Sequence, residues 1–307
     1  MKLERCRLDR RPAARALPFL TILATFAGLG LSGAVAVTQK NEQKSGAPER
    51  TFENFDHKNF DRSTNIDNKW FPLKPGMRYV YKGSTQEGRK RVPHRVVIIV
   101  TDLVKVIDGV PSVVVFERDY KDGNLAESEL AFFAQDKEGN VWHLGELTET
   151  YDEDEFVGGK AFLVGTEGAK AGIMMQAEPR PGTPSYSQGY APPPINWTDR
   201  AKVDQVGQKT CVATGCYGSV VVIAESSEEE GPDAQQLKYY APGVGFVRVG
   251  WRGKGEKLRE TLELAEVVKL DPEALAKVRA EALELEKRAL VYGRAPPAEP
   301  MPAPERQ

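Results

Sequence analysis

Cysteine and histidine are scarce in this chain, which has three of each among 307 residues. One cysteine lies close to the N-terminus, so the rest of the chain forms at most one disulfide, and no neighbouring histidine completes a zinc site with the other two. The sequence also lacks a Gly-x-Ser-x-Gly elbow, a His-Glu-x-x-His pair, a Walker loop and a dinucleotide-binding glycine fingerprint. We therefore predict no metal and no cofactor.

Neither sign of charge dominates, because the formal net charge is -2. Basic residues are concentrated in the first fifteen positions, so the remainder of the chain is more acidic than the whole. Proteins that bind nucleic acid need a basic surface to neutralise phosphates. We therefore predict no nucleic-acid partner.

The N-terminal segment predicts export. Its basic start is followed by an uncharged run over 16–37, which contains the small-x-small pattern Ala34-Val35-Ala36. We interpret residues 1–36 as a signal sequence or membrane anchor, since about 22 uncharged residues at ~1.5 Å each can cross a bilayer. Glycines in the run favour cleavage, and no cysteine follows it to carry a lipid. The predicted location is extracytoplasmic, secreted or anchored by residues 16–37, with no other contact to the membrane.

Residues 37–50 are polar and aperiodic, and they predict a linker before a single domain over 51–269. Within this domain Cys211 and Cys216 flank a short glycine-containing turn. In an oxidising compartment such a pair is expected to form a disulfide. The spacing is not Cys-x-x-Cys, which argues against the alternative of a redox or metal pair.

The domain predicts a mainly β fold, a curled antiparallel sheet or partial barrel with one C-terminal helix packed on it. Runs rich in β-branched and aromatic residues are separated by Asp-Gly and Gly-Asn pairs, which are typical of hairpin turns. The expected strands cover 77–82, 92–106, 113–120, 125–134, 141–147, 202–206, 219–224, 236–240, 245–251 and 260–269. The acidic run 151–155 predicts a solvated turn. The long proline-rich stretch 177–200 predicts a partly ordered cover over the sheet.

A helix is expected over 270–292. Asp271 is a favourable N-cap, Pro272 suits the first helical position, and apolar residues follow at spacings of three and four. Residues 293–307 are proline-rich and predict a disordered tail.

Two groups of residues are candidates for a functional site. His94, His143 and Glu146 are weak candidates for acid–base catalysis, and the favoured interpretation is that they have structural roles. The candidate ligand-binding residues are aromatic, adaptable or basic side chains of the sheet: Tyr79, Tyr81, Arg95, Trp142, Met174, Met175 and Tyr239.

Three phrases carry a resemblance to known proteins: Trp70-Phe-Pro-Leu-Lys-Pro-Gly76, the segment 134–142, and Lys238-Tyr-Tyr-Ala-Pro-Gly-Val-Gly245. Together they resemble an uncharacterised family of exported bacterial β-rich proteins, over roughly 65–268. The third phrase is also loosely similar to half-barrels of the lipoprotein-carrier type. The resemblance implies a curved antiparallel sheet with helical packing, and it implies no catalytic residues.

Three functions remain open from the sequence. The first is an exported binding or carrier module for an apolar or amphipathic ligand, such as a small molecule or lipid. The second is a secreted hydrolase or isomerase that uses His143 and Glu146, with His94 as a possible third group. The third is a structural envelope protein that meets a protein partner through its C-terminal helix.

Overall fold

The computed structural model describes residues 50–228, 231 and 233–302. The predicted leader over 1–36 and residues 37–49 of the predicted linker therefore lie outside the described residues. No helix in the described part of the chain is both long enough and apolar enough to cross a membrane.

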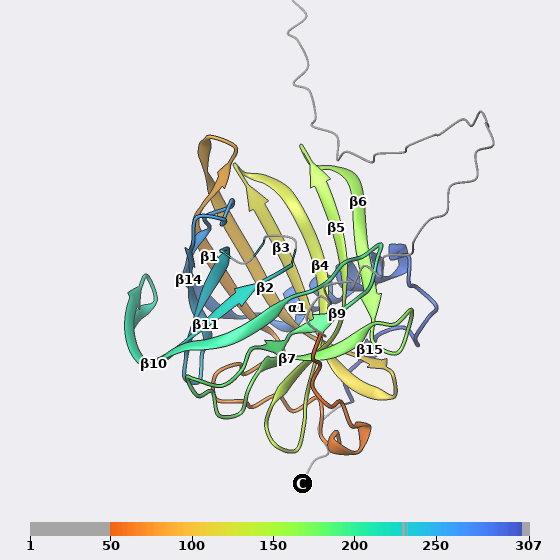
Figure 1. The fold of residues 1–307 in the computed structure, drawn as a ribbon. Coiled ribbons are helices and arrows are strands. Elements are labelled where there is room, and N and C mark those ends of the chain that lie inside the picture. The colour runs from red at the N-terminus through yellow and green to blue at the C-terminus, as the bar shows by residue number, and fades with distance from the viewer. Residues whose placement is uncertain (1–49, 229–230, 232, 303–307) are drawn as a thin grey trace, which may run out of the picture. The chain divides into compact units, whose positions relative to one another are not determined.

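The described chain forms a large antiparallel sheet that curls without closing into a barrel, together with one α-helix (Figure 1). The strand order is β8-β10-β11-β12-β13-β14-β1-β2-β3-β4-β5-β7-β9, with β6 paired to β5 and β15 paired to β2. The bounds are η1 His57–Asn59, β1 Met77–Glu87, β2 Lys90–Ile107, β3 Val110–Lys121, β4 Asn124–Gln135, β5 Val141–Asp152, β6 Glu155–Leu163, β7 Lys170–Met175, β8 Tyr186–Ser187, β9 Gly189–Tyr190, β10 Arg200–Val212, β11 Gly215–Ser226, β12 Gln235–Ala241, β13 Gly245–Arg252, β14 Thr261–Lys269, α1 Pro272–Arg288 and β15 Glu299–Pro300. The predicted mainly β fold is confirmed.

The tight turns follow from their residues. Asp108-Gly109 joins β2 to β3 and Asp122-Gly123 joins β3 to β4, with positive φ at all four positions. Two-residue hairpin turns that match the twist of the strands require such φ values, which Asp and Gly tolerate. The acidic run 151–155 contains the turn between β5 and β6, as expected. The strands β6 and β7 were not predicted from the sequence.

The proline-rich stretch 177–200 connects the two ends of the curled sheet. Tyr186–Ser187 pairs with β10, which belongs to one end, and Gly189–Tyr190 pairs with β7 at the other end. Between them the Gln188 backbone N–H donates to the Asp199 carbonyl over 2.9 Å. This segment is therefore ordered, and it brings the sheet ends together around the space they enclose.

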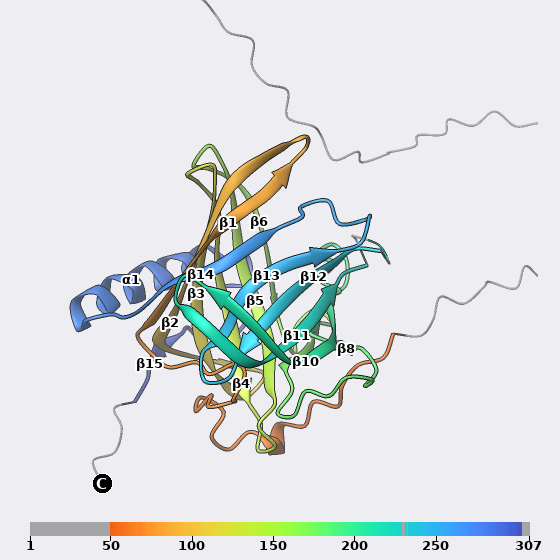
Figure 2. The ribbon, with the colours of Figure 1, turned by 90° about the vertical axis from the view of Figure 1, so that its left-hand side faces the viewer.

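Alternation along the strands gives the sheet two apolar faces. On the concave face, side chains such as Val115 and Phe133 meet those of β10–β14, including Val221 and Leu264. On the convex face, Leu130 belongs to a second core that includes the apolar side of α1. Figure 2 shows α1 on one side of β1–β3 and strands β10–β13 on the other.

The helix begins as predicted and ends earlier. The Asp271 side chain accepts a hydrogen bond from the Ala274 backbone N–H at 2.8 Å, and Arg288 is the last helical residue instead of residue 292. Ala282 and Leu285 are buried against the convex face. The predicted packing of this helix on the sheet is therefore observed.

The prediction of a disordered tail is wrong for residues 298–302. Pairing between β1 and β2 stops at Ile99, so the edge of β2 beyond this point is open, and Glu299–Pro300 pairs with Leu103 and Val104 there. The Met301 backbone N–H also donates to the Asp102 carbonyl at 2.8 Å. Proline suits this position because an edge strand needs donors on one side only.

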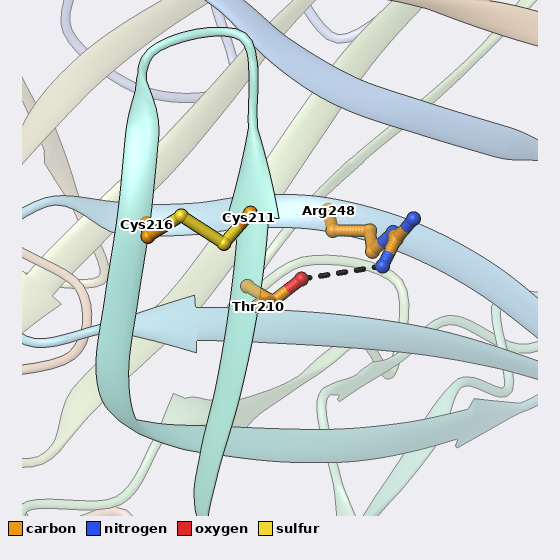
Figure 3. Close-up of a disulfide and its surroundings, with 4 residues drawn as sticks. All are labelled: Thr210, Cys211, Cys216 and Arg248. Carbon is orange, nitrogen blue, oxygen red and sulfur yellow. Dashed lines mark hydrogen bonds between the residues drawn. A yellow bond between two sulfur atoms is a disulfide. The ribbon is translucent and has the colours of Figure 1, made fainter.

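The predicted disulfide is present. Cys211 and Cys216 occupy facing positions on β10 and β11, with their Cα atoms 4.0 Å apart (Figure 3). Beside them, Arg248 of β13 donates to the Thr210 hydroxyl at 3.2 Å. The disulfide therefore closes the end of a hairpin that extends over the neighbouring strands.

Candidate functional site

The concave core leaves a cavity of about 230 Å³ between the two halves of the curled sheet. Most of its wall is apolar, and a cluster of charged and polar side chains lies on part of it. The lining residues are Phe71, Pro72, Leu73, Tyr79, Tyr81, Ile98, Val115, Glu117, Glu129, Ala131, Phe133, His143, Glu146, Met174, Gln188, Trp197, Asp199, Glu225, Lys238, Tyr240, Val244, Gly245 and Phe246. Apolar pockets with a few convergent polar groups are the usual form of a small-molecule site.

Aromatic side chains form much of the apolar wall. Tyr81 and Phe246 stack with ring centroids 4.2 Å apart, and the Tyr81 hydroxyl donates to the Phe246 carbonyl at 3.0 Å. Phe71 packs edge-on against Phe133 at 5.3 Å and lies 6.2 Å from Tyr240. These contacts fix the rings in place, so the wall is pre-formed.

A bulge in β5 places His143 and Glu146 on the same face. Phe133 pairs with His143 and Phe132 pairs with Gly145, so Leu144 is an extra residue in the ladder. Three residues of separation would otherwise put the two side chains on opposite faces. Glycine is required at 145, because a Cβ there would lie 2.5 Å from the Phe162 carbonyl oxygen. The bulge therefore creates the polar corner of the cavity.

His143 is held by backbone carbonyls. Its Nδ1 lies 3.1 Å from the Gln188 oxygen and its Nε2 lies 2.9 Å from the Gly145 oxygen. Burial lowers the pKa of His143 to about 4, although both carbonyl contacts act in the opposite direction. The Glu146 carboxyl is 3.9 Å away at its nearest approach. Since both ring nitrogens face carbonyl oxygens, His143 holds the segment 186–190 in place and is not free to act as a base.

Three carboxyl groups from adjacent strands form a cluster on the cavity wall. Glu117 of β3 lies directly opposite Glu129 of β4, and Glu146 of β5 is paired with the next cavity-facing position of β4, Ala131. The Thr148 hydroxyl lies 2.7 Å from Glu146 and 3.5 Å from Glu129. A hydroxyl has one proton to donate, so it satisfies one of these two carboxyls at a time.

Burial and mutual repulsion favour the protonated form of the carboxyls in this cluster. Burial, reinforced by Glu129, raises the pKa of Glu117 well above its usual value, and burial with Glu146 does the same for Glu129. Burial raises the pKa of Glu146 to about 8, against the hydrogen bond from Thr148. Carboxyls that share a low-dielectric site cannot all ionise together.

On another part of the cavity wall, Lys238 is paired with Glu225. The two groups form an ion pair of 2.8 Å, and the Gln188 side chain donates to the same carboxyl at 2.9 Å. Gln188 also contacts the Met174 sulfur at 3.4 Å. The closing segment 186–190 is thereby tied to the cavity wall.

The structure brings five of the candidate residues to the cavity: Tyr79, Tyr81, His143, Glu146 and Met174. It places the others elsewhere. Met175 is fully buried in the concave core without lining the cavity, and Tyr239 lines a separate surface depression with Arg248. His94 and Arg95 do not line the cavity with His143.

Trp142 and Arg95 lie away from the cavity for reasons of strand alternation. The Trp142 ring is on the convex side, where it contacts Phe55 and Phe60 and donates to Asp136 at 2.7 Å. Arg95 is exposed, and its guanidinium lies 3.9 Å from the centre of the Tyr120 ring. Each neighbours a concave-face residue in sequence and so points outward.

His94 belongs to a separate charged cluster. Its Nε2 is 2.6 Å from Asp119 and its Nδ1 is 2.8 Å from Glu260, so both ring nitrogens face carboxylate oxygens. Burial lowers the pKa of His94, but the two carboxylates outweigh it and raise the value to about 9. The ring is therefore a charged structural link between β2, β3 and the segment before β14.

The sequence analysis missed most polar residues of the cavity, including Glu117, Glu129, Glu225 and Lys238. Charged side chains in strands usually face water, and nothing in one sequence distinguishes a carboxyl on the concave face. One indication was available: Glu117 continues the alternation of Val113 and Val115. In the part of the chain that the structure describes, no group of three or more potential ligands is arranged to hold a metal ion.

Comparison with known proteins gives distant structural neighbours. No family model matches the chain, and no curated protein matches it. One solved structure that it is similar to is a Bacteroides fragilis protein described as exported and as having a YmcC-like fold, with 15% identity and a TM-score of 0.39, covering 66% of this chain and 100% of that one. Another is a Parabacteroides distasonis protein described as a lipoprotein, with 15% identity and a TM-score of 0.31, covering 66% of this chain and 99% of that one.

Proposed function

We propose that this protein is an exported binding module that holds a small amphipathic ligand in the cavity of its curled sheet. The observation that carries the proposal is the unfilled space of about 230 Å³ in an otherwise packed concave core. Protein interiors rarely leave such a space unless it is used. Export is supported by the leader pattern and by the disulfide between Cys211 and Cys216.

The form of the cavity favours a ligand with two chemically different ends. Rings such as Phe71, Phe133 and Phe246 offer apolar contact, while Glu117 and Glu129 offer polar groups. A purely apolar ligand would leave the Glu117 carboxyl without a hydrogen-bond partner, and burying an unpaired polar group costs free energy. The ligand we expect is therefore amphipathic.

The geometry argues against the acid–base alternative. His143 and Glu146 do share a face, but both nitrogens of His143 contact backbone carbonyls. Neither ring nitrogen is left to exchange a proton with a substrate in the cavity.

Native mass spectrometry of the protein, purified from its own host without detergent, tests the proposal. We expect extra mass that disappears on denaturation. Ala131→Leu, which adds volume inside the cavity, should reduce that mass, whereas Ala126→Leu on the same strand should not, because Ala126 does not line the cavity. A wild-type protein that carries no additional mass, and that takes up no amphipathic probe on incubation, would contradict the proposal.

A further inference from the structure

The lining of the cavity holds more carboxyl groups than ammonium groups. Five carboxyl groups line it, against one ammonium group. The ammonium of Lys238 is paired with Glu225 at 2.8 Å. Lys238 also acts on Glu117 and Glu129 at longer range, but the ion pair that it forms is with Glu225 and not with the cluster of Glu117, Glu129 and Glu146.

Hydrogen bonding satisfies the three carboxyls of the cluster unequally. The Thr148 hydroxyl lies 2.7 Å from Glu146 and 3.5 Å from Glu129, and a side-chain hydrogen bond also joins Glu129 and Glu146. Glu117 accepts no hydrogen bond from any described residue. Once ionised, a carboxyl group offers about four acceptor sites in all, so the acceptor capacity of Glu117 is open to the cavity.

Tyr240 gives an independent indication of a ligand. Its side chain is 1% exposed and lines the same cavity, yet its hydroxyl makes no hydrogen bond with a described residue. Buried tyrosine hydroxyls usually have a partner. A polar group of a bound molecule would provide one.

The rings of the wall suit the same kind of ligand. Tyr79 and Phe133 line the cavity together with the carboxyl cluster. Aromatic faces attract cations, most strongly where water is excluded. Carboxylates combined with aromatic faces are therefore the chemistry that recognises an organic ammonium group with an apolar body.

We propose that the ligand of this cavity is a protonated amine, whose ammonium group is taken by Glu117, Glu129 and Glu146 and whose apolar body packs against the aromatic wall. This inference rests on the proposed function and specifies the ligand class. Burial holds protons on the empty cluster, with the pKa of Glu146 raised to about 8. The arriving ammonium replaces one proton, which a carboxyl of the cluster releases to solvent, so the net charge in the cavity is unchanged.

Isothermal titration calorimetry with three matched probes at pH 7.5 tests the inference. The probes are benzylammonium, benzyl alcohol and benzoate, which share the ring and differ in charge. We expect benzylammonium to bind at least tenfold more tightly than benzyl alcohol, and benzoate to give no measurable binding. The apparent binding enthalpy of benzylammonium should also depend on the ionisation enthalpy of the buffer, because binding releases a proton.

Conservative variants separate the cluster from the cavity. Glu117→Gln combined with Glu129→Gln keeps size and shape, and it should weaken benzylammonium at least tenfold while leaving benzyl alcohol within about twofold. Glu138→Gln is the control, since Glu138 is exposed in the turn after the same strand and does not line the cavity. It should leave both affinities unchanged.

The outcomes distinguish this inference from the function on which it rests. Equal affinity for benzylammonium and benzyl alcohol, with both lost in Ala131→Leu, would overturn the amine and retain the binding module. Binding of calcium ions with no response to benzylammonium would also overturn the amine. Failure of all three probes in the wild-type protein, together with an absence of co-purified mass, would overturn both.

Discussion

Glu117 and Glu129 face each other across β3 and β4, and both carboxyl groups line the cavity of the concave core. Like charges at directly opposite positions of a sheet are destabilising. The fold tolerates the pair because burial and proximity raise the pKa of both carboxyls and so favour their neutral forms. This arrangement does not stabilise the protein without a ligand. We interpret it as a site that binds a cation in the cavity.

Removing one charge of the cluster should stabilise the protein at high pH. The pKa of Glu146 is raised from 4.5 to about 8, so the folded state holds a proton that the unfolded state has lost between these values, and stability falls as pH rises through this window. We expect Glu146→Gln to raise the free energy of unfolding by about 1–2 kcal/mol at pH 9 and to change it little at pH 4.

Urea unfolding at the two pH values measures this effect. The groups that act on Glu146 are the carboxyls of Glu117, Glu127, Glu129 and Asp199, together with the Thr148 hydroxyl, His143 and Lys238. A gain of the same size at both pH values would contradict a proton-linked origin.

His94 should stabilise the folded protein in its charged form, whereas Glu146 does so in its neutral form. The pKa of His94 in the folded protein is raised from 6.5 to about 9, so the contribution is fully present below pH 6.5 and is lost as pH rises through 9. Asp119 and Glu260 contact the ring. Lys121 of β3 is the cross-strand partner of His94, and Glu127 also lies near it. We expect His94→Gln to cost about 3 kcal/mol at pH 6 and clearly less at pH 10. Equal losses at both values, measured by thermal or urea unfolding, would show that the charge of the ring is unimportant.

A buried ion pair joins the helix and the tail to the sheet. Lys105 of β2 and Glu286 of α1 are 2.5 Å apart, with side chains 4% and 2% exposed. Lys105 also donates to the Pro296 carbonyl at 2.7 Å, and the Glu286 carboxyl accepts from the Ala298 backbone N–H at 3.1 Å. Both groups therefore hold the tail as well as each other.

Breaking this pair should be costlier than removing it. We expect Lys105→Met or Glu286→Leu alone to lower the free energy of unfolding by about 3 kcal/mol, because each leaves a buried charge unpaired. The double variant should lose less than the sum of the single losses, as a double-mutant cycle detects. Strictly additive losses would mean that the two charges do not depend on each other.

The disulfide should act on stability and leave ligand binding intact. Cys211 and Cys216 enclose a short loop, for which the chain-entropy model gives about 2 kcal/mol. Neither residue lines the cavity. We expect Cys211→Ser with Cys216→Ser to lower the unfolding midpoint in urea and to retain the affinity for benzylammonium. Loss of affinity in a variant that is still folded would show that the hairpin takes part in the site.

Much of the fold is readable from short-range patterns. Pairs such as Asp108-Gly109 and Asp122-Gly123 have the φ values that hairpin turns need, so the strands beside them follow. The strand β6 was missed because Gly158 and Gly159 interrupt its pattern, and its pairing depends on the long neighbour β5. The ordered tail was missed because its place depends on an open edge of β2, which is a property of the assembled sheet.

The site is less accessible to such reasoning. His143 and Glu146 share a face because of a bulge at Leu144, and a regular alternation predicts the opposite. Glu117 and Lys238 come from strands that are distant in the sheet order. The curl of the sheet brings both side chains to the same cavity. Aromatic candidates such as Tyr79 and Tyr81 were found because the apolar face of a strand is visible in its sequence. The polar partners were not, because their neighbours are defined in three dimensions.

Methionine methyl groups provide the most direct test that the cavity is the binding site. Met174 lines the cavity, whereas Met77 and Met301 do not. In a protein labelled with 13C at the methionine methyls, titration with benzylammonium should shift the Met174 resonance to saturation and leave those of Met77 and Met301 in place. Saturable shifts of Met77 or Met301 with no change at Met174 would place the ligand elsewhere and contradict the account.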